Sequence, residues 1–173
     1  SMSDIFEMAN NTPSKASAFV QTLLEIGRNY DMQVEHFLLA SLRSYQKMHA
    51  NYFSELEKKA RHFLEKKAKN IQLSPSLLEQ ILLNEYDVLL TFKDLSKYSK
   101  LESLRSIWIQ GKKQKIVINQ KLNTAQKMFE LGKEIYYQAN KIKLRPELST
   151  WMQVKSFEQV LNNFKASYFA GAL

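Results

Sequence analysis

Long proline-free stretches with apolar residues at steps of three and four constrain the fold of this chain more than any other feature. The first runs from Ser14 to Asn70, and its one glycine is Gly27. Its apolar positions include Phe19, Leu23, Ile26, Tyr30, Val34, Leu38, Leu42, Tyr45, Met48, Tyr52, Leu56, Ala60 and Phe63. This spacing places side chains on one face of an α-helix. We therefore expect helical structure over 14–70, either as one helix or as two that break at Gly27.

The rest of the chain shows the same spacing between turn signals. Ser74 before Pro75 predicts a helix start, because serine is a good N-cap and proline suits the first helical position. We expect helices over about 74–110, 115–143 and 146–168, with a turn at Gly111. One β-branched run, at 116–118, is too short to make a sheet alone. The sequence thus predicts a single all-α domain over 1–173, with a flexible segment at 1–12. Its architecture would be an elongated antiparallel bundle of about four to five helices with coiled-coil-like packing.

The predicted helix over 115–143 carries a heptad-like seam. Small residues recur seven apart on one edge and larger apolar residues on the other, and the candidate contacts are Ala125, Phe129, Gly132, Tyr136 and Ala139. Small residues at this spacing let a second helix approach closely. The seam therefore predicts either packing within an antiparallel bundle or a homodimer interface. Tyr137 is adjacent to Tyr136 and cannot face the same core, so it is a candidate exposed contact.

Composition removes several classes of protein. The chain has no cysteine, which excludes disulfide frameworks, iron–sulfur clusters and thiol nucleophiles. No apolar run is long enough to span a membrane, and the first residues lack the pattern of a secretory signal. We therefore expect a cytoplasmic protein.

No motif for a metal, cofactor or small-molecule substrate is visible, and we expect none of the three. His36, His49 and His62 are thirteen apart, so a straight helix points successive rings about 140° apart and cannot aim them at one metal. The chain has no His-Glu-x-x-His zinc motif and no glycine-rich phosphate loop. Glu130 and Glu134 lie among lysines, which predicts a solvated helix face with local ion pairs.

Arg43 and His49 resemble in spacing the arginine–histidine pair of HEPN-type ribonucleases, which are small helical bundles. The resemblance covers these two residues and implies that Arg43 would bind phosphate and His49 would act as general acid or base. Ser44 follows the arginine, where that family prefers Asn, Asp or His, and the pair comes early in the chain. We expect both residues to be ordinary polar side chains and the protein not to be an enzyme.

Charge is unevenly distributed along a chain whose formal net charge is +8. Residues 93–121 carry eight basic side chains against two acidic ones: Lys93, Lys97, Lys100, Arg105, Lys112, Lys113, Lys115 and Lys121 against Asp94 and Glu102. The first seven are candidate contacts for phosphate or an acidic partner. A second basic cluster lies at 58–69, and in an antiparallel bundle the two would lie at opposite ends. Because lysine reads bases poorly, nucleic-acid binding through these residues would be nonspecific and sensitive to salt.

These observations favour a non-catalytic helical adaptor, scaffold or assembly subunit that acts through protein–protein contacts and is a candidate homo-oligomer. One alternative is a nonspecific nucleic-acid-binding protein that uses the basic region 93–121. Another is a helical protein that binds an anionic membrane or granule surface.

Overall fold

The fold combines helices with a small mixed sheet, so the expected all-α bundle is wrong. The computed structural model describes residues 18, 21–23, 25–26, 34–149 and 156–173. The named helices are α3 (Val34–Met48), α4 (Ser54–Lys67), α5 (Pro75–Tyr86), α6 (Thr124–Ala139) and α7 (Phe157–Gly171). The strands are β1 (Leu89–Lys93), β2 (Ser106–Ile109) and β3 (Lys115–Asn119), and a short 3₁₀ helix covers Leu95–Lys97.

The sheet has β3 at its centre, in the order β1-β3-β2. β1 pairs with β3 in parallel and β2 pairs with it antiparallel. Leu90, Ile116 and Trp108 are in register across the three strands. Because side chains alternate between the faces of a sheet, this row and the row through Ile118 face the same way, toward α5 and α6. The β-branched run that looked too short for a sheet is therefore its central strand.

The opposite face of the sheet is covered by a smaller cluster. Val117 and Ile107 pack with Leu95, Leu104 and Leu148 there. The segment 147–149 also continues the sheet beyond β2, because the Trp108 amide donates to the Glu147 carbonyl at 2.8 Å and the Ser149 amide donates to Ser106 at 3.2 Å. The edge of β2 is thus closed by a strap that follows α6 in the chain.

The predicted helix over 74–110 was correct at its start and wrong at its end. The Ser74 hydroxyl accepts from the Leu77 amide at 3.3 Å and Pro75 is the first helical residue, which confirms the predicted cap. Asp87 then ends the helix in the left-handed conformation, with φ of 52°. The apolar residues beyond Asp87 also fit a helical spacing. Their backbone groups instead form hydrogen bonds with β3, and this nonlocal pairing cannot be seen in the periodicity of the sequence.

The other predicted helices are shorter than expected for similar reasons. Residues 115–119 form β3, and α6 begins only after an Asn123–Gln126 capping box. α7 begins after Ser156, whose hydroxyl accepts from the Gln159 amide at 3.2 Å. Residues 150–155 lie outside the described residues.

The helices of the first segment turn at a corner that the sequence did not mark. Gly27 and most of its neighbours lie outside the described residues. The corner between α3 and α4 is at 49–53, where Ala50 and Asn51 have positive φ of 50° and 57°. An aromatic cluster fixes the corner against α7, with Phe53 5.0 Å from Phe164 and 5.2 Å from Tyr168 between ring centres.

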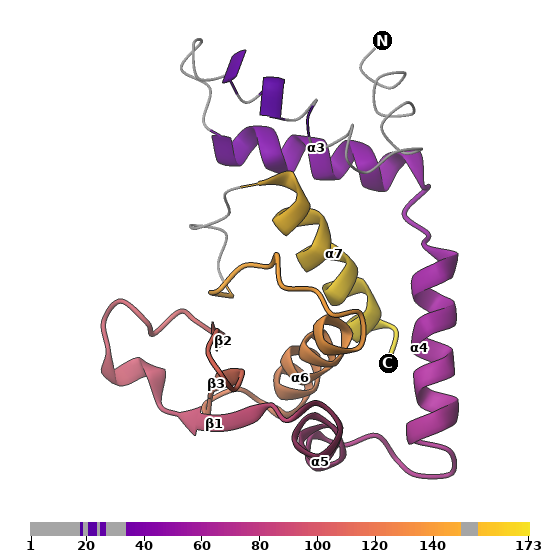
Figure 1. Cartoon of the computed structure of the whole chain (residues 1–173), viewed down its shortest axis with the longest axis vertical. Helices are drawn as coiled ribbons and strands as arrows, with labels where there is room; N and C mark the ends of the chain where they lie inside the picture. Colours follow the sequence, from indigo (N-terminus) through magenta and orange to yellow (C-terminus); the bar gives the residue numbers. More distant parts are fainter. Residues whose placement is uncertain (1–17, 19–20, 24, 27–33, 150–155) are drawn as a thin grey trace.

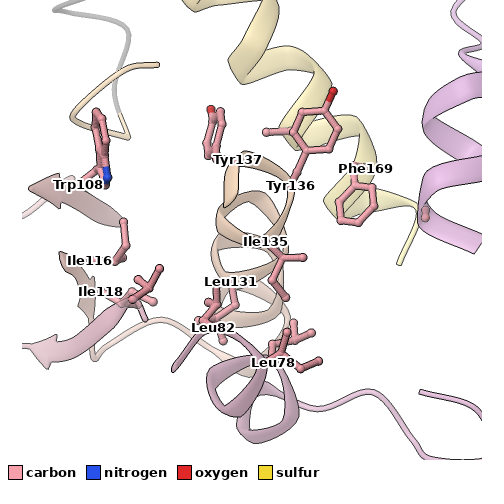
Figure 2. Close-up of a cluster of buried hydrophobic side chains, with 14 of the residues drawn as sticks. Leu78, Leu82, Trp108, Ile116, Ile118, Leu131, Ile135, Tyr136, Tyr137 and Phe169 are labelled. Carbon is pink, nitrogen blue, oxygen red and sulfur yellow. The ribbon is translucent and has the colours of Figure 1, made fainter. Parts of the chain in front are cut away.

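The main core lies where α5, α6, α7 and the sheet meet (Figure 1). Figure 2 shows Leu82 of α5, Leu131 of α6 and Ile118 of β3 pointing toward one another. α6 packs along α7 and α5 rather than in a coiled-coil pair, so the coiled-coil expectation is also wrong. Within the described residues, no helix is both long and apolar enough to cross a membrane.

Candidate functional site

A buried cluster of charged side chains lies between α6, β2 and the strap. Glu134 is 2% exposed, and its two carboxylate oxygens lie 2.6 Å from the Gln138 amide and 2.7 Å from the Arg145 guanidinium. Glu130 is 6% exposed and accepts from the Ser106 hydroxyl at 2.6 Å. The two carboxylates are therefore interior groups, and the expectation that they lie on a solvated helix face is wrong.

Arg145 anchors this cluster by stacking as well as by charge. Its guanidinium lies 3.7 Å from the ring centre of Tyr137 and 4.7 Å from that of Trp108. Burial raises the pKa of Tyr137, and the arginine only partly offsets this effect. Tyr137 is 2% exposed, so the expectation that it is a surface contact is wrong.

The cluster is closed and balanced in formal charge. Lys133 lies 4.0 Å from Glu130, and its burial lowers its pKa. Two glutamates therefore face one lysine and one arginine around a cavity of about 20 Å³. A space of this size holds about one water molecule. Within the described residues, the indole nitrogen of Trp108 and Nε of Arg145 have no hydrogen-bond partner, and a single water there would suit them.

The residues around Glu130 do not suit a zinc hydrolase. A His-Glu-x-x-His site would need histidine at the positions of Phe129 and Lys133. Lys133 instead supplies a positive charge beside the carboxylate. Among the residues that the structure describes, no group of three or more His, Asp or Glu side chains could hold a metal ion.

The basic side chains of 93–121 separate into two groups. Lys112, Lys113 and Lys115 lie at the β2–β3 turn, whereas Lys93, Lys97, Lys100, Arg105 and Lys121 lie near the other end of the strands. The length of β3 keeps the groups about 13 Å apart. The structure therefore does not bring the predicted contacts into one patch.

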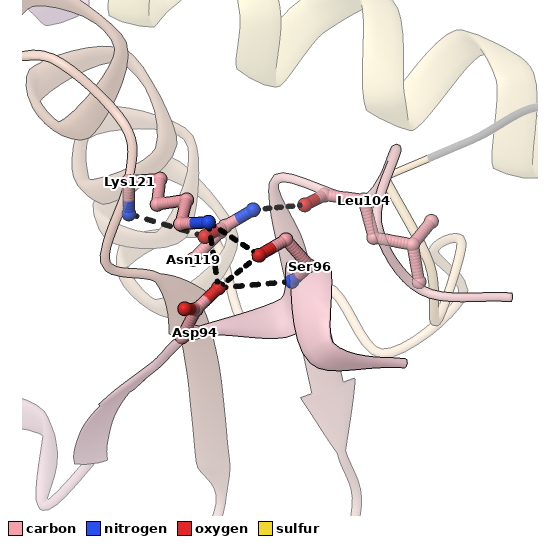
Figure 3. Close-up of polar contacts among 5 residues, drawn as sticks. All are labelled: Asp94, Ser96, Leu104, Asn119 and Lys121. Carbon is pink, nitrogen blue, oxygen red and sulfur yellow. Dashed lines mark hydrogen bonds and ion pairs between the residues drawn. The ribbon is translucent and has the colours of Figure 1, made fainter. Parts of the chain in front are cut away.

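At one end of the sheet, Lys121 belongs to a network of polar contacts around the turn that follows β1 (Figure 3). Lys121 lies 3.4 Å from Asp94, and the Asp94 carboxylate also accepts from the Ser96 amide and hydroxyl. These hydrogen bonds from Ser96, and then Lys121, lower the pKa of Asp94. Buried Asn119 connects the same turn to the Leu104 carbonyl at 3.2 Å. Lys121 therefore stabilises this turn through its contacts with Asp94 and Ser96.

At the other end, lysines flank exposed apolar side chains. Leu89 and Ile109 both pair with Lys115, so the three form one row across the outer face of the sheet. Leu89 is 41% exposed and Ile109 is 45% exposed. Lys112 is exposed beside them, and Lys113 pairs with Asp87 at 3.1 Å. We call Leu89, Ile109, Lys112, Lys113 and Lys115 the outer-face patch.

The predicted helix seam is divided between different environments. Gly132 faces α7, since a Cβ there would lie 3.1 Å from the Ala170 Cβ, and Tyr136 packs on Phe169. Phe129 is half-buried, while Ala125 and Ala139 are exposed. The close approach that Gly132 allows at the centre of the seam is therefore made by α7 of the same chain.

The residues compared with HEPN ribonucleases lie on α3 and at the corner that follows it. Arg43 is exposed on α3, and His49 lies one residue beyond the end of that helix. The His49 ring lies in the aromatic corner, 4.7 Å from Tyr45 and 4.9 Å from Phe53. The three histidines lie on α3, at the corner and on α4 respectively.

Sequence reasoning missed Arg145, Ser106 and the apolar members of the outer-face patch. No signal in the sequence marked the buried cluster. Glu130, Lys133 and Glu134 are three and four residues apart, so they form one polar face of a helix, and such a face is usually solvated.

Comparison with known proteins gives a fold and no family. No family model matches the chain, and no curated protein matches it significantly. A solved structure described as a Mycobacterium tuberculosis transcriptional regulator is similar, with a TM-score of 0.58 and 15% sequence identity over 76% of this chain. The similar region covers 39% of that regulator, so the chain spans well under half of its length. At this identity the similarity shows a shared fold.

Proposed function

We propose that this chain is a non-catalytic interaction domain whose outer-face patch binds an acidic partner protein. The observation that carries the proposal is the row Leu89–Lys115–Ile109, in which two exposed apolar side chains flank a lysine. Exposed apolar groups ringed by charge are typical of protein contacts. Lys115 within the row and the neighbouring Lys112 would favour acidic groups on the partner, whereas Lys113 is already paired with Asp87.

The buried charged cluster supports a role without catalysis. Its carboxylates are held by Arg145, Gln138 and Ser106, and its cavity has room for about one water. A catalytic site needs space for a reacting group beside its acid or base. The similar region of the mycobacterial transcriptional regulator suggests, by analogy of fold, that the partner belongs to a regulatory assembly.

A second candidate function is nonspecific nucleic-acid binding, and the same lysines favour it. Phosphate contacts from Lys112, Lys113 and Lys115 would give an affinity that falls steeply with salt. This candidate does not need Leu89 or Ile109, because nonspecific binding is mainly electrostatic. The apolar pair therefore discriminates between the two functions.

The test compares two probes on two variants. The probes are a fluorescent short peptide that alternates Glu with Leu and a fluorescent short DNA duplex, both followed by anisotropy. We expect the combined variant Leu89→Ser with Ile109→Ser to weaken peptide binding by about tenfold or more. We expect Lys112→Glu with Lys113→Glu and Lys115→Glu to weaken it at least as much.

The control is a pair of serine substitutions at exposed apolar residues outside the patch, Ile71→Ser and Leu83→Ser. The proposed function fails if the peptide does not bind, or if the Leu89 and Ile109 variant binds it as the unmodified chain does. Duplex binding that depends on the lysines and ignores the apolar pair would establish the second candidate instead.

A further inference from the structure

A groove of ligand size lies on the other side of α6, between α4, α5, α6 and α7. Its volume is about 360 Å³. Pockets that hold small molecules are commonly about 300 to 1,000 Å³. Figure 1 shows α4 beside the C-terminal end of α7, with α6 next to that end and α5 below α6. The side chains that line the groove come from all four helices.

The groove exists because α4 has few apolar residues with which to fill it. Leu56 and Ala60 are buried, and Phe63 meets Phe169 of α7 at 6.0 Å between ring centres. Beyond Phe63 the helix continues with Leu64, Glu65, Lys66 and Lys67. At the far end, Lys67 pairs with Glu85 of α5 at 2.7 Å and ties the two helices together. The space between these two contacts is left open.

One face of α4 presents two lysines and a histidine to this space. Lys59, His62 and Lys66 all line the groove, and their spacing places them on one side of the helix. Lys59 donates to the Asn140 side chain and lies 5.6 Å above the ring centre of Tyr136. Lys66 is exposed and has no ion-pair partner among the described residues. The one acidic residue that lines the groove, Glu85, is already paired with Lys67.

The opposite walls are aromatic. Tyr136 of α6 and Phe169 of α7 lie with ring centres 5.4 Å apart, and Figure 2 shows the two side by side. Tyr86 closes the α5 side and Phe63 the α4 side. Aromatic faces bind flat apolar groups well, and lysines bind phosphate, sulfonate or carboxylate groups. The groove therefore combines a surface for an apolar body with a rim for an anionic group.

We propose that this groove binds a small organic anion. Its charged group lies between Lys59 and Lys66, and its apolar body lies against Tyr136, Phe63 and Phe169. The net positive rim disfavours cations, and the restricted volume between four helices favours a small molecule over a strand or helix of a partner. The site is separate from the outer-face patch and uses none of its residues.

The experiment uses 1-anilinonaphthalene-8-sulfonate, an aromatic anion that fluoresces in apolar sites, as the probe. We expect saturable binding to the folded chain. Lys66→Glu should weaken it by about tenfold or more, because it places a negative charge at the rim. Ala139→Trp should weaken it similarly by filling the groove, because exposed Ala139 lines it.

Each variant has a matched control outside the groove. Lys69→Glu makes the same charge change just after α4, and Ala125→Trp makes the same size change at an exposed position of α6. Both should leave the affinity within about twofold. The uncharged probe N-phenyl-1-naphthylamine should bind more weakly than the sulfonate.

Competition identifies the source of the anion. Adenosine monophosphate offers a phosphate on an aromatic base, and decanoate offers a carboxylate on an aliphatic chain. Displacement of the probe by either supports the proposal and names the class. The proposal is overturned if neither competes, if the uncharged probe binds equally well, or if Lys66→Glu and Ala139→Trp bind the sulfonate as their controls do.

Discussion

The two sides of α6 treat charge in opposite ways. On the side of the sheet, Glu130, Glu134 and Arg145 are buried, and the two glutamates pair with Lys133 and Arg145 respectively. On the side of α4, Lys59 and Lys66 line an open groove whose one acidic residue, Glu85, is already paired with Lys67. Buried charge must be paired because desolvation is costly, whereas exposed charge can remain available to a ligand. We therefore expect the first group to stabilise the fold, and we expect Lys66, which has no ion-pair partner among the described residues, to be available to a ligand.

The largest expected effect comes from removing the arginine on the buried side. Arg145→Met should lower the free energy of unfolding by about 3–5 kcal/mol, because it leaves the Glu134 carboxylate buried without its cation. Urea denaturation followed by circular dichroism measures the loss. Lys143→Met, at an exposed position two residues away, should stay within about 0.5 kcal/mol.

A double variant separates charge from packing at this position. Adding Glu134→Gln to Arg145→Met removes the orphaned charge, so the combined loss should be smaller than the sum of the two single losses. A loss below about 1 kcal/mol for Arg145→Met alone would show that the buried cluster does not stabilise the fold.

The next effect concerns the α6–α7 contact, on which both sides of α6 depend. Gly132→Val should destabilise the protein by about 1–3 kcal/mol, because even a Cβ at this position would lie 3.1 Å from that of Ala170 and 3.3 Å from Leu173. Thermal denaturation measures this change. Gly171→Ala is the comparison, since a Cβ there meets nothing within 4 Å. It should leave the Tm unchanged or raise it, and an equal fall in both variants would contradict the tight packing at Gly132.

A pH effect should arise from tyrosines on both sides of the helix. Burial, and then the charge of Tyr45, raises the pKa of Tyr136 to about 12, and burial also raises the pKa of Tyr137. A raised tyrosine pKa means that the unfolded chain loses its proton first, so stability is retained below pH 10 and falls as the pH rises from 10 toward 12. Tyr136→Phe should reduce that slope. Tyr98→Phe, at a residue 56% exposed, should not, and equal slopes in the two variants would refute the assignment.

The features of the helices that depend on neighbouring residues could be predicted from the sequence. The cap at Ser74 and Pro75 was predictable because serine and proline act on their own neighbours. The sheet was not, because β1 and β2 each depend on pairing with β3 across segments of chain, and Leu89–Lys93 reads equally well as part of a helix.

The candidate sites divide in the same way. The lysines of the outer-face patch were visible in the sequence, but their separation from Lys93 and Lys97 depends on the direction of the strands. The groove could not be predicted, because it is the space left between four helices. Only its row of Lys59, His62 and Lys66 was present beforehand, within the second basic cluster.

The smallest expected effect completes the comparison between the two sides. Lys66→Met and Arg145→Met each remove one positive charge near α6. Lys66 lies in the open groove, whereas Arg145 lies in the buried cluster. Because Lys66 has no ion-pair partner among the described residues and lies near other cations, its loss should change the free energy of unfolding by no more than about 0.5 kcal/mol, with any change toward higher stability. The same urea titration measures it, and lower salt should enlarge any gain because screening weakens. A loss as large as that of Arg145→Met would mean that Lys66 is already committed to the fold, and the groove would then have no spare charge to offer an anion.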